Sequence, residues 1–246
     1  MKTDDAYQPN QFTGLLSTPP EALRYDNVGS GPGDAHMLLA NWVPIGASVL
    51  DVGAGTGAFG DMLQRERQAK VICLEPDEAR AALARERGLT VHTSTVAEFA
   101  ASSSQLFDVV VLADVLEHLS YPGPMLTQLR PLLAENGHLL ISVPNVAHWL
   151  IRVALLRGRF DYESMGPMDA THLRWFTSKT LHRLLPACGF VIDGEAGTVG
   201  EWHEVYSSRL PWTMIPPAYR FSVLRRLVNW FPGAFALQHI VRARLA

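Results

Sequence analysis

Short apolar runs alternate with longer amphipathic segments along most of the chain. The apolar runs predict strands near residues 47–52, 71–75, 90–93, 107–112, 138–143, 189–195 and 235–244. The segments between them predict helices near residues 34–42, 57–68, 77–87, 123–134, 146–156, 178–187 and 217–230. This alternation predicts an α/β fold in which a mostly parallel, doubly wound sheet carries helices on both faces.

Composition narrows the class of protein. The chain has 246 residues, of which 48% are hydrophobic, enough for one α/β domain with a substantial core. Its net charge of −3 argues against a general nucleic-acid binder. Two cysteines, Cys73 and Cys188, do not make a disulfide framework, so a cytoplasmic location is expected. Met1–Thr13 lacks the apolar core of a signal peptide, and no run reaches the roughly 18 apolar residues of a spanning helix.

A glycine-rich turn, Asp51-Val-Gly-Ala-Gly-Thr-Gly57, joins the first predicted strand to the next helix. Glycine lets a ligand approach the main chain closely, and the unpaired N–H groups at a helix start face that ligand. The turn therefore predicts a site for a nucleoside-containing cofactor. Gly55-Thr-Gly-Ala-Phe-Gly60 also fits the dinucleotide pattern, so on this turn alone a nicotinamide cofactor stays open.

The order of an acid and three alternating glycines resembles the first motif of class I S-adenosylmethionine (SAM) methyltransferases. The resemblance continues through Asp114-Val-Leu-Glu-His118 and through Asn136-Gly137 before the fifth strand, and it runs from about Asp26 to Gly197. It implies a Rossmann-like, seven-stranded sheet of order 3-2-1-4-5-7-6 with the last strand antiparallel. It also implies SAM as the cofactor.

The resemblance assigns a SAM pocket. The glycine turn would surround the methionine portion, the acid after the second strand would accept the ribose hydroxyls, and two residues after the third strand would meet the adenine edge. The expected cofactor-binding residues are Asp51, Gly53, Ala54, Gly55, Gly57, Glu75, Pro76, Thr95, Val96 and Asp114.

A second group of polar residues suggests a metal-binding or catalytic site. Asp114, Glu117 and His118 are spaced i, i+3 and i+4, so on a helical turn they would share one face at the carboxyl edge of the sheet. His172 is a fourth candidate. Two carboxylates and two imidazoles suit a divalent metal such as Mg²⁺ or Zn²⁺, which can lower the pKa of a hydroxyl group.

The same residues resemble the E-x-x-E-H motif, followed by a distant histidine, of ubiquinone-pathway and small-RNA 2′-O-methyltransferases. Asp114 stands where those families usually have glutamate, and His172 matches the distant histidine. The resemblance implies a metal site of Asp114, Glu117, His118 and His172. Two alternatives stay open for the catalytic candidates His118 and His172: a metal-free site with His172 as general base, and a purely structural role.

The chain divides into an N-terminal arm, 1–25, and a methyltransferase domain, 26–246, with insertions at about 158–176 and 198–234. The first insertion would cover the mouth of the site and direct Arg159, Tyr162 and Arg174 toward the substrate. Val143-Pro-Asn-Val-Ala-His-Trp149 and the segments near it resemble bacterial methyltransferases of glycan and natural-product biosynthesis.

The C-terminal region is basic and amphipathic. Residues 205–246 contain six arginines and no acid, and 217–231 carries several aromatic and aliphatic side chains. This helix could cover the sheet edge or the substrate cleft, form a homodimer contact, or lie on a membrane surface. The protein would then be cytoplasmic, or peripheral at the membrane.

These patterns favour O-methylation of a hydroxyl group on a small molecule or glycan in a biosynthetic pathway. The alternatives are an N-methyltransferase and a non-catalytic auxiliary protein with a SAM fold. No nucleic-acid substrate is expected, because the basic charge is confined to the C-terminal region.

Overall fold

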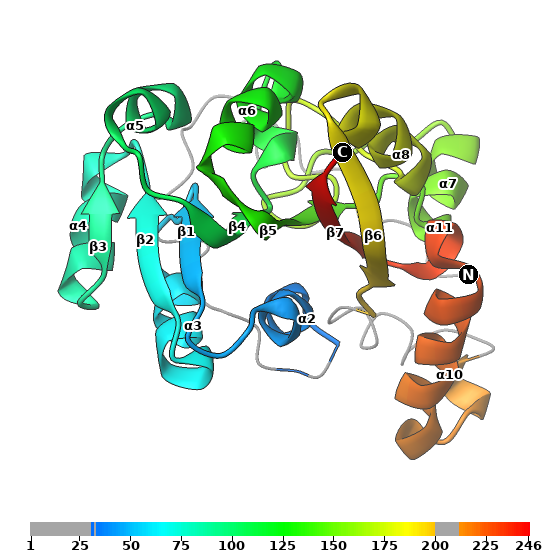
Figure 1. The fold of residues 1–246 in the computed structure, drawn as a ribbon. Helices are drawn as coiled ribbons and strands as arrows, with labels where there is room; N and C mark the ends of the chain where they lie inside the picture. The colour runs from blue at the N-terminus through cyan, green and yellow to red at the C-terminus, as the bar shows by residue number, and fades with distance from the viewer. Residues whose placement is uncertain (1–30, 32, 200–211) are drawn as a thin grey trace.

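A computed structural model describes residue 31, residues 33–199 and residues 212–246, and it contains one seven-stranded sheet (Figure 1). The strands are β1 (Ser48–Val52), β2 (Lys70–Leu74), β3 (Thr90–His92), β4 (Phe107–Ala113), β5 (Leu133–Pro144), β6 (Phe190–Gly197) and β7 (Gln238–Leu245). Their order is β3-β2-β1-β4-β5-β7-β6, and β7 runs antiparallel to both of its neighbours. The predicted fold class and strand order are confirmed. The expected N-terminal arm lies outside the described residues, as do residues 200–211 of the second expected insertion.

Helices cover both faces of the sheet. The α-helices are α2 (Ala35–Trp42), α3 (Ala58–Arg67), α4 (Glu78–Glu86), α5 (Val96–Ser102), α6 (Pro122–Leu129), α7 (Trp149–Leu156), α8 (Ser178–Ala187), α10 (Pro217–Trp230) and α11 (Pro232–Phe235). The 3₁₀ turns are η1 (Leu116–His118), η2 (Arg130–Leu132) and η3 (Trp212–Met214). One core lies under α5, α6 and α8, and a second lies under α2, α3 and α4.

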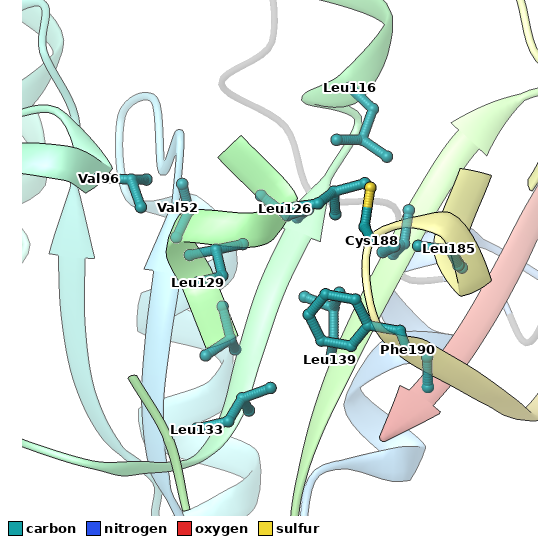
Figure 2. Packing of buried hydrophobic residues seen from close by; sticks show 14 of the residues in the cluster. Val52, Val96, Leu116, Leu126, Leu129, Leu133, Leu139, Leu185, Cys188 and Phe190 are labelled. Carbon is teal, nitrogen blue, oxygen red and sulfur yellow. The ribbon is translucent and has the colours of Figure 1, made fainter. Parts of the chain in front are cut away.

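The first core shows why these helices are held in place. Leu126 and Leu129 of α6 and Leu185 of α8 converge over Leu139 and Phe190 of the sheet (Figure 2). All five side chains have an exposed fraction of 0%. Complete burial of so many large apolar groups is the main force that fixes α6 and α8 against the sheet.

Several elements differ from the predicted ones, and three of the differences have a readable cause. Helix α5 was not predicted, although Thr95 and Glu98 form a capping box at its start. Helix α6 ends at Leu129 and continues only as a 3₁₀ turn, because Pro131 cannot extend an α-helix. Strand β7 starts three residues later than predicted, at Gln238, because α11 occupies the chain before it.

The strand register sets the position of the loops that follow. Val52 at the end of β1 pairs with Leu74 at the end of β2, and Ala113 at the end of β4 pairs with Ser142 of β5. The loops after these parallel strands therefore leave the sheet at one edge. Open α/β sheets bind their ligands at that edge.

Candidate active site

The glycine turn after β1 leaves an open face. Gly53, Gly55 and Gly57 have φ values of 71°, 56° and 78°, and the N–H groups of Gly53 and Ala54 donate to the carbonyl of Leu74. A Cβ atom on Gly55 would meet no heavy atom of the described residues within 4 Å, so with respect to these residues its backbone faces open space. A side chain there would be strained and would occupy the space in front of the turn.

Two acids stand behind this turn. Glu75 accepts from the N–H of Gly55 at 2.8 Å and from the N–H of Asp77 at 2.9 Å. Asp51 is 2% exposed, and its Oδ2 has no hydrogen-bond partner among the described residues. Burial, with the charge of Glu75, raises the pKa of Asp51 to about 7. A cationic group such as an ammonium would therefore be favoured beside it.

The residues expected at the adenine edge also have structural roles. Thr95 caps α5 by accepting from the N–H of Glu98, and its own N–H donates to the Glu98 carboxylate. Val96 is buried in the core under α5, whereas Pro76 is exposed just after Glu75. Contacts between Thr95, Val96, Pro76 and adenine stay a prediction.

Three of the four expected metal ligands lie together. The donor atoms of Glu117, His118 and His172 all lie within 4.8 Å of one another, and the two imidazole centroids are 4.9 Å apart. Glu117 and His118 belong to the 3₁₀ turn η1 at the end of β4. His172 comes from the first expected insertion, more than fifty residues along the chain.

Backbone hydrogen bonds bring His172 to this position. The N–H groups of Leu173 and Arg174 donate to the carbonyl of Glu117 at 2.7 and 3.0 Å. Buried Asp169 closes the preceding turn by accepting from the N–H and the hydroxyl of Thr171 at 2.8 and 2.6 Å. The insertion is thus tied to the loop after β4 by the residues that follow His172, and Asp169 fixes the turn that precedes it.

The environment of Glu117 is unfavourable for a lone carboxylate. Its side chain is 1% exposed, and neither carboxylate oxygen has a hydrogen-bond partner among the described residues. Burial and the charge of Asp114 raise the pKa of Glu117 well above its usual value. An unpaired buried charge is costly, and a divalent cation would offset that cost.

The imidazoles of His118 and His172 are also suited to bind a divalent cation. Burial and neighbouring His118 lower the pKa of His172, which favours the neutral form that binds metals. Nδ1 of His118 lies 3.4 Å from the carbonyl oxygen of Thr171. If Nδ1 carries the proton, Nε2 is left as the ligand atom, and outer contacts of this kind orient metal-binding histidines.

Asp114 does not join this group, contrary to the expected four-residue set. Its φ of 53° lies in the left-handed region, so the chain turns away from the helical path that would align it with Glu117 and His118. Its carboxylate instead accepts from the hydroxyl of Ser142 at 3.0 Å and from the amide of Gln238 at 2.9 Å. Among the described residues, the candidate metal group is reduced to two histidines and one glutamate.

The expected substrate residues lie in the insertion that carries His172. Arg159 forms an exposed ion pair with Asp161 at 2.7 Å, and the exposed side chain of Arg174 donates to the carbonyl of Leu173. Tyr162 makes an edge contact with the ring of Phe160. Their contact with a substrate stays a prediction.

Two residues near the site were missed in the sequence. His36 of α2 packs against Phe59 of α3, with ring centroids 5.1 Å apart and the rings tilted, and lies within electrostatic reach of Asp114. Gln238 lies at the start of β7, 124 residues from Asp114. Neither belongs to a local motif, so only the folded chain reveals them.

Comparisons with known proteins agree with this architecture. Residues 26–194 match a family model described as a methyltransferase domain. A ubiquinone biosynthesis O-methyltransferase of Vibrio vulnificus is 35% identical over 106 residues, which cover 41% of this chain and 45% of that protein. An uncharacterized protein of Mycobacterium tuberculosis is 32% identical over 142 residues, which cover 57% of this chain and 46% of that protein. The chain thus spans less than half the length of both relatives.

Solved structures share the fold. A SAM-dependent methyltransferase from Archaeoglobus fulgidus matches with a TM-score of 0.55 and 18% identity, covering 80% of this chain and 85% of that one. A Haloferax volcanii methyltransferase, solved in complex with its activator Trm112, matches with a TM-score of 0.56 and 12% identity. The match covers 86% of this chain and 88% of that one. With its glycine turn, its strand order and this family match, the chain belongs to the class I SAM-dependent methyltransferases.

Proposed function

We propose that the protein transfers a methyl group from SAM to a hydroxyl group of a small molecule or glycan, assisted by Mg²⁺ or Zn²⁺. The observation that carries this proposal is the buried Glu117 carboxylate, which has no hydrogen-bond partner in the described part of the chain and lies beside His118 and His172. One carboxylate and two imidazoles form a donor set that a divalent cation can occupy while it keeps positions for substrate.

The glycine turn and its two acids would hold the cofactor. Asp51 suits the ammonium of SAM, because a positive charge stabilises its buried carboxylate. Glu75 already fixes the turn through the N–H of Gly55, and the resemblance to the family assigns it the ribose hydroxyls. Bound SAM supplies a methyl group on a positively charged sulfur, so the protein's main tasks are alignment, proton removal and exclusion of water.

The cluster after β4 would prepare the acceptor. A bound cation would supply Lewis acidity, which lowers the pKa of a hydroxyl group. Glu117, His118 and His172 would hold that cation and orient the acceptor. In the alternative without a metal, the lowered pKa of His172 keeps its imidazole neutral and able to take the acceptor proton near pH 7.

The partial relatives favour oxygen as the acceptor atom. Several are named ubiquinone biosynthesis O-methyltransferase, although each alignment covers only part of this chain. Amines need no activation by a metal, so N-methylation would not explain why the buried Glu117 carboxylate lies beside two imidazoles. An auxiliary role without catalysis is less well supported, because the open face at Gly55 and the buried acid Asp51 are both retained.

A methyl-transfer assay tests this function. Chelator-treated protein would receive SAM labelled in its methyl group and a panel of hydroxylated small molecules, glycans and matched amines, with and without Mg²⁺ or Zn²⁺. We expect label on a hydroxyl acceptor that depends on added cation and is lost in His118→Ala/His172→Ala. Label on amines alone, or transfer that the chelator leaves unchanged, would contradict the metal-assisted O-methylation.

We also propose a peripheral membrane contact, in the cytoplasm, through the α10 surface, defined as exposed Tyr219, Arg225, Arg226, Trp230 and Phe231. Described residues 212–246 contain arginines and no acid. Figure 1 places α10 at the β6 end of the sheet, and Leu224 and Val228 form its buried face. Aromatic side chains beside arginines suit an anionic lipid surface. No helix among the described residues is long and apolar enough to span a bilayer.

A further inference from the structure

The loop after β4 carries two carboxylates, Asp114 and Glu117, whose surroundings differ. Glu117 is buried beside two imidazoles and has no hydrogen-bond partner among the described residues. Asp114, three residues earlier, is half-buried and accepts three side-chain hydrogen bonds. Both carboxylate oxygens of Asp114 are therefore already hydrogen-bonded, whereas those of Glu117 have no such partner in the part of the chain that the structure describes.

Gln238 fixes the Asp114 carboxylate from the far end of the chain. Its amide nitrogen lies 2.9 Å from both carboxylate oxygens, and the hydroxyl of Ser142 lies 3.0 Å from one of them. The main chain of Asp114 is fixed as well, because its N–H donates to the hydroxyl and the carbonyl of Ser142. Its left-handed φ of 53° is an unusual conformation for a residue other than glycine, and these contacts hold it.

Contacts on either side place Asp114 next to the glycine turn. The side chain of the following residue, Val115, would lie 2.9 Å from a Cβ atom on Gly53, so the β4 loop touches the turn directly. His36, within electrostatic reach of Asp114, packs on Phe59 at the start of α3, just after the turn. Asp114 thus stands between the cofactor turn and the cluster of Glu117, His118 and His172.

The family resemblance places Asp114 both in the SAM pocket and among the metal ligands. We infer that Gln238 is a positioning residue that holds the Asp114 carboxylate in the SAM pocket, beside the sulfonium, and away from the metal set. This rests on the proposed function, in which the methyl group faces an acceptor held at Glu117, His118 and His172. The sulfonium must then lie between the glycine turn and that cluster, where Asp114 stands. A fixed carboxylate near the sulfonium would favour charged SAM over S-adenosylhomocysteine, whose sulfur is neutral.

Calorimetric titration of the full chain tests this inference. Wild type, Asp114→Asn, Gln238→Ala and His172→Ala would each be titrated with SAM, with S-adenosylhomocysteine and, after chelator treatment, with Mg²⁺ and Zn²⁺. Gln128→Ala on the exposed face of α6 is a matched control. We expect Asp114→Asn to weaken SAM binding about tenfold or more while the affinities for S-adenosylhomocysteine and metal change little, since the carboxylate attracts the positive sulfonium and S-adenosylhomocysteine carries no such charge. Gln238→Ala should lower the ratio of SAM affinity to S-adenosylhomocysteine affinity by a smaller factor than Asp114→Asn does.

Three results would overturn the inference. Loss of metal affinity in Asp114→Asn to the extent seen in His172→Ala would make Asp114 a metal ligand. Equal weakening of SAM and S-adenosylhomocysteine, with a lowered melting temperature, would give Asp114 and Gln238 a structural role only. If Gln238→Ala left the ratio of SAM affinity to S-adenosylhomocysteine affinity unchanged, Gln238 would have no role in positioning Asp114. Wild type that binds SAM but no metal would instead contradict the proposed metal assistance, and the comparison between SAM and S-adenosylhomocysteine would still decide the role of Asp114.

Discussion

At the scale of single residues, two buried acids mark the site. Asp51 and Glu117 have exposed fractions of 2% and 1%, and each has at least one carboxylate oxygen without a hydrogen-bond partner among the described residues. Unpaired carboxylates of this kind are costly in a protein interior. Each acid makes physical sense when a cation lies beside it, an ammonium for Asp51 and a divalent metal for Glu117.

We predict that SAM binding near pH 7 releases a proton from Asp51. The pKa of this carboxyl is about 7 in the free protein, so about half of the molecules carry the proton at that pH. An ammonium beside it would lower that pKa. Calorimetric titrations in buffers of different ionisation enthalpy measure the released protons, and Asp51→Asn should abolish the release. Heat that is independent of the buffer would contradict the role of Asp51.

We predict that metal-free protein loses stability as the pH rises, and that Glu117 contributes to the loss. The pKa of Glu117 in the folded protein is raised well above the usual 4.5. At pH values between the usual pKa and the raised one, the folded state therefore binds more protons than the unfolded state. The free energy of unfolding therefore falls as the pH rises through that window. Melting temperatures from pH 5 to pH 8 should fall more steeply for wild type than for Glu117→Gln.

Added Mg²⁺ or Zn²⁺ supplies the control for this experiment. A cation that binds the Glu117 carboxylate stabilises only the folded state, so it should raise the melting temperature of wild type near pH 7. Glu117→Gln should show little response. Identical slopes for wild type and Glu117→Gln would show that the carboxylate is not the source of the pH dependence.

At the scale of elements, the sequence predicted the regular parts of the fold well. Helices α8 and α10 begin and end where the amphipathic pattern placed them, and the strand order follows the family resemblance. Helix α5 was missed because it is short, although Thr95 and Glu98 carried a readable capping signal. The pairing of Asp114 with Gln238 could not be predicted, because no local pattern links residues 124 positions apart.

The cluster of Glu117, His118 and His172 was partly predictable. The spacing of Glu117 and His118 placed them together, and the family resemblance added His172. The position of Asp114 outside the three clustered donor groups was not predictable, since it depends on a left-handed φ that the sequence gives no reason to expect at an aspartate. Local chemistry is therefore readable in the sequence, whereas the direction of each side chain depends on the folded backbone.

We predict that Asp169→Ala weakens metal binding without unfolding the domain. Asp169 is fully buried and accepts two hydrogen bonds from Thr171, which close the turn that presents His172. Loss of these bonds should cost about 1–3 kcal/mol locally and lower metal affinity about tenfold. Metal titration and thermal melting measure the two effects.

Thr177→Ala is the matched control for this variant. Thr177 caps α8 a few residues beyond His172, and its loss should cost about 1 kcal/mol of stability. It should leave metal affinity unchanged, because its hydroxyl interacts with Thr180 rather than with the turn. Equal losses of metal affinity in both variants would indicate a general loosening of the region instead of a specific role for Asp169.

At the scale of the whole molecule, the candidate active site and the α10 surface lie in different parts of the structure. The carboxyl ends of β1, β2 and β4 carry the acids and imidazoles, whereas α10 lies at the β6 end of the sheet (Figure 1). A membrane contact there could therefore leave the proposed SAM pocket accessible. The same surface could alternatively bury a second copy of the chain.

We predict that the protein binds vesicles containing anionic lipid more tightly than neutral phosphatidylcholine vesicles. Each arginine near an anionic surface contributes about 1 kcal/mol, so Arg225→Gln/Arg226→Gln should weaken binding by about tenfold or more. Lys179→Gln/Arg183→Gln on the exposed face of α8 removes the same charge elsewhere and should have little effect. Co-sedimentation measures binding. A stable dimer in solution with no vesicle binding would assign the α10 surface to a second copy.

The most direct test of the account is calorimetric titration of chelator-treated protein with Mg²⁺ and Zn²⁺, in the presence of SAM. The account predicts one cation per chain, with binding lost in His118→Ala/His172→Ala while SAM affinity is retained. Wild type that binds neither cation, or a double variant that binds as tightly as wild type, would contradict a metal site at Glu117, His118 and His172.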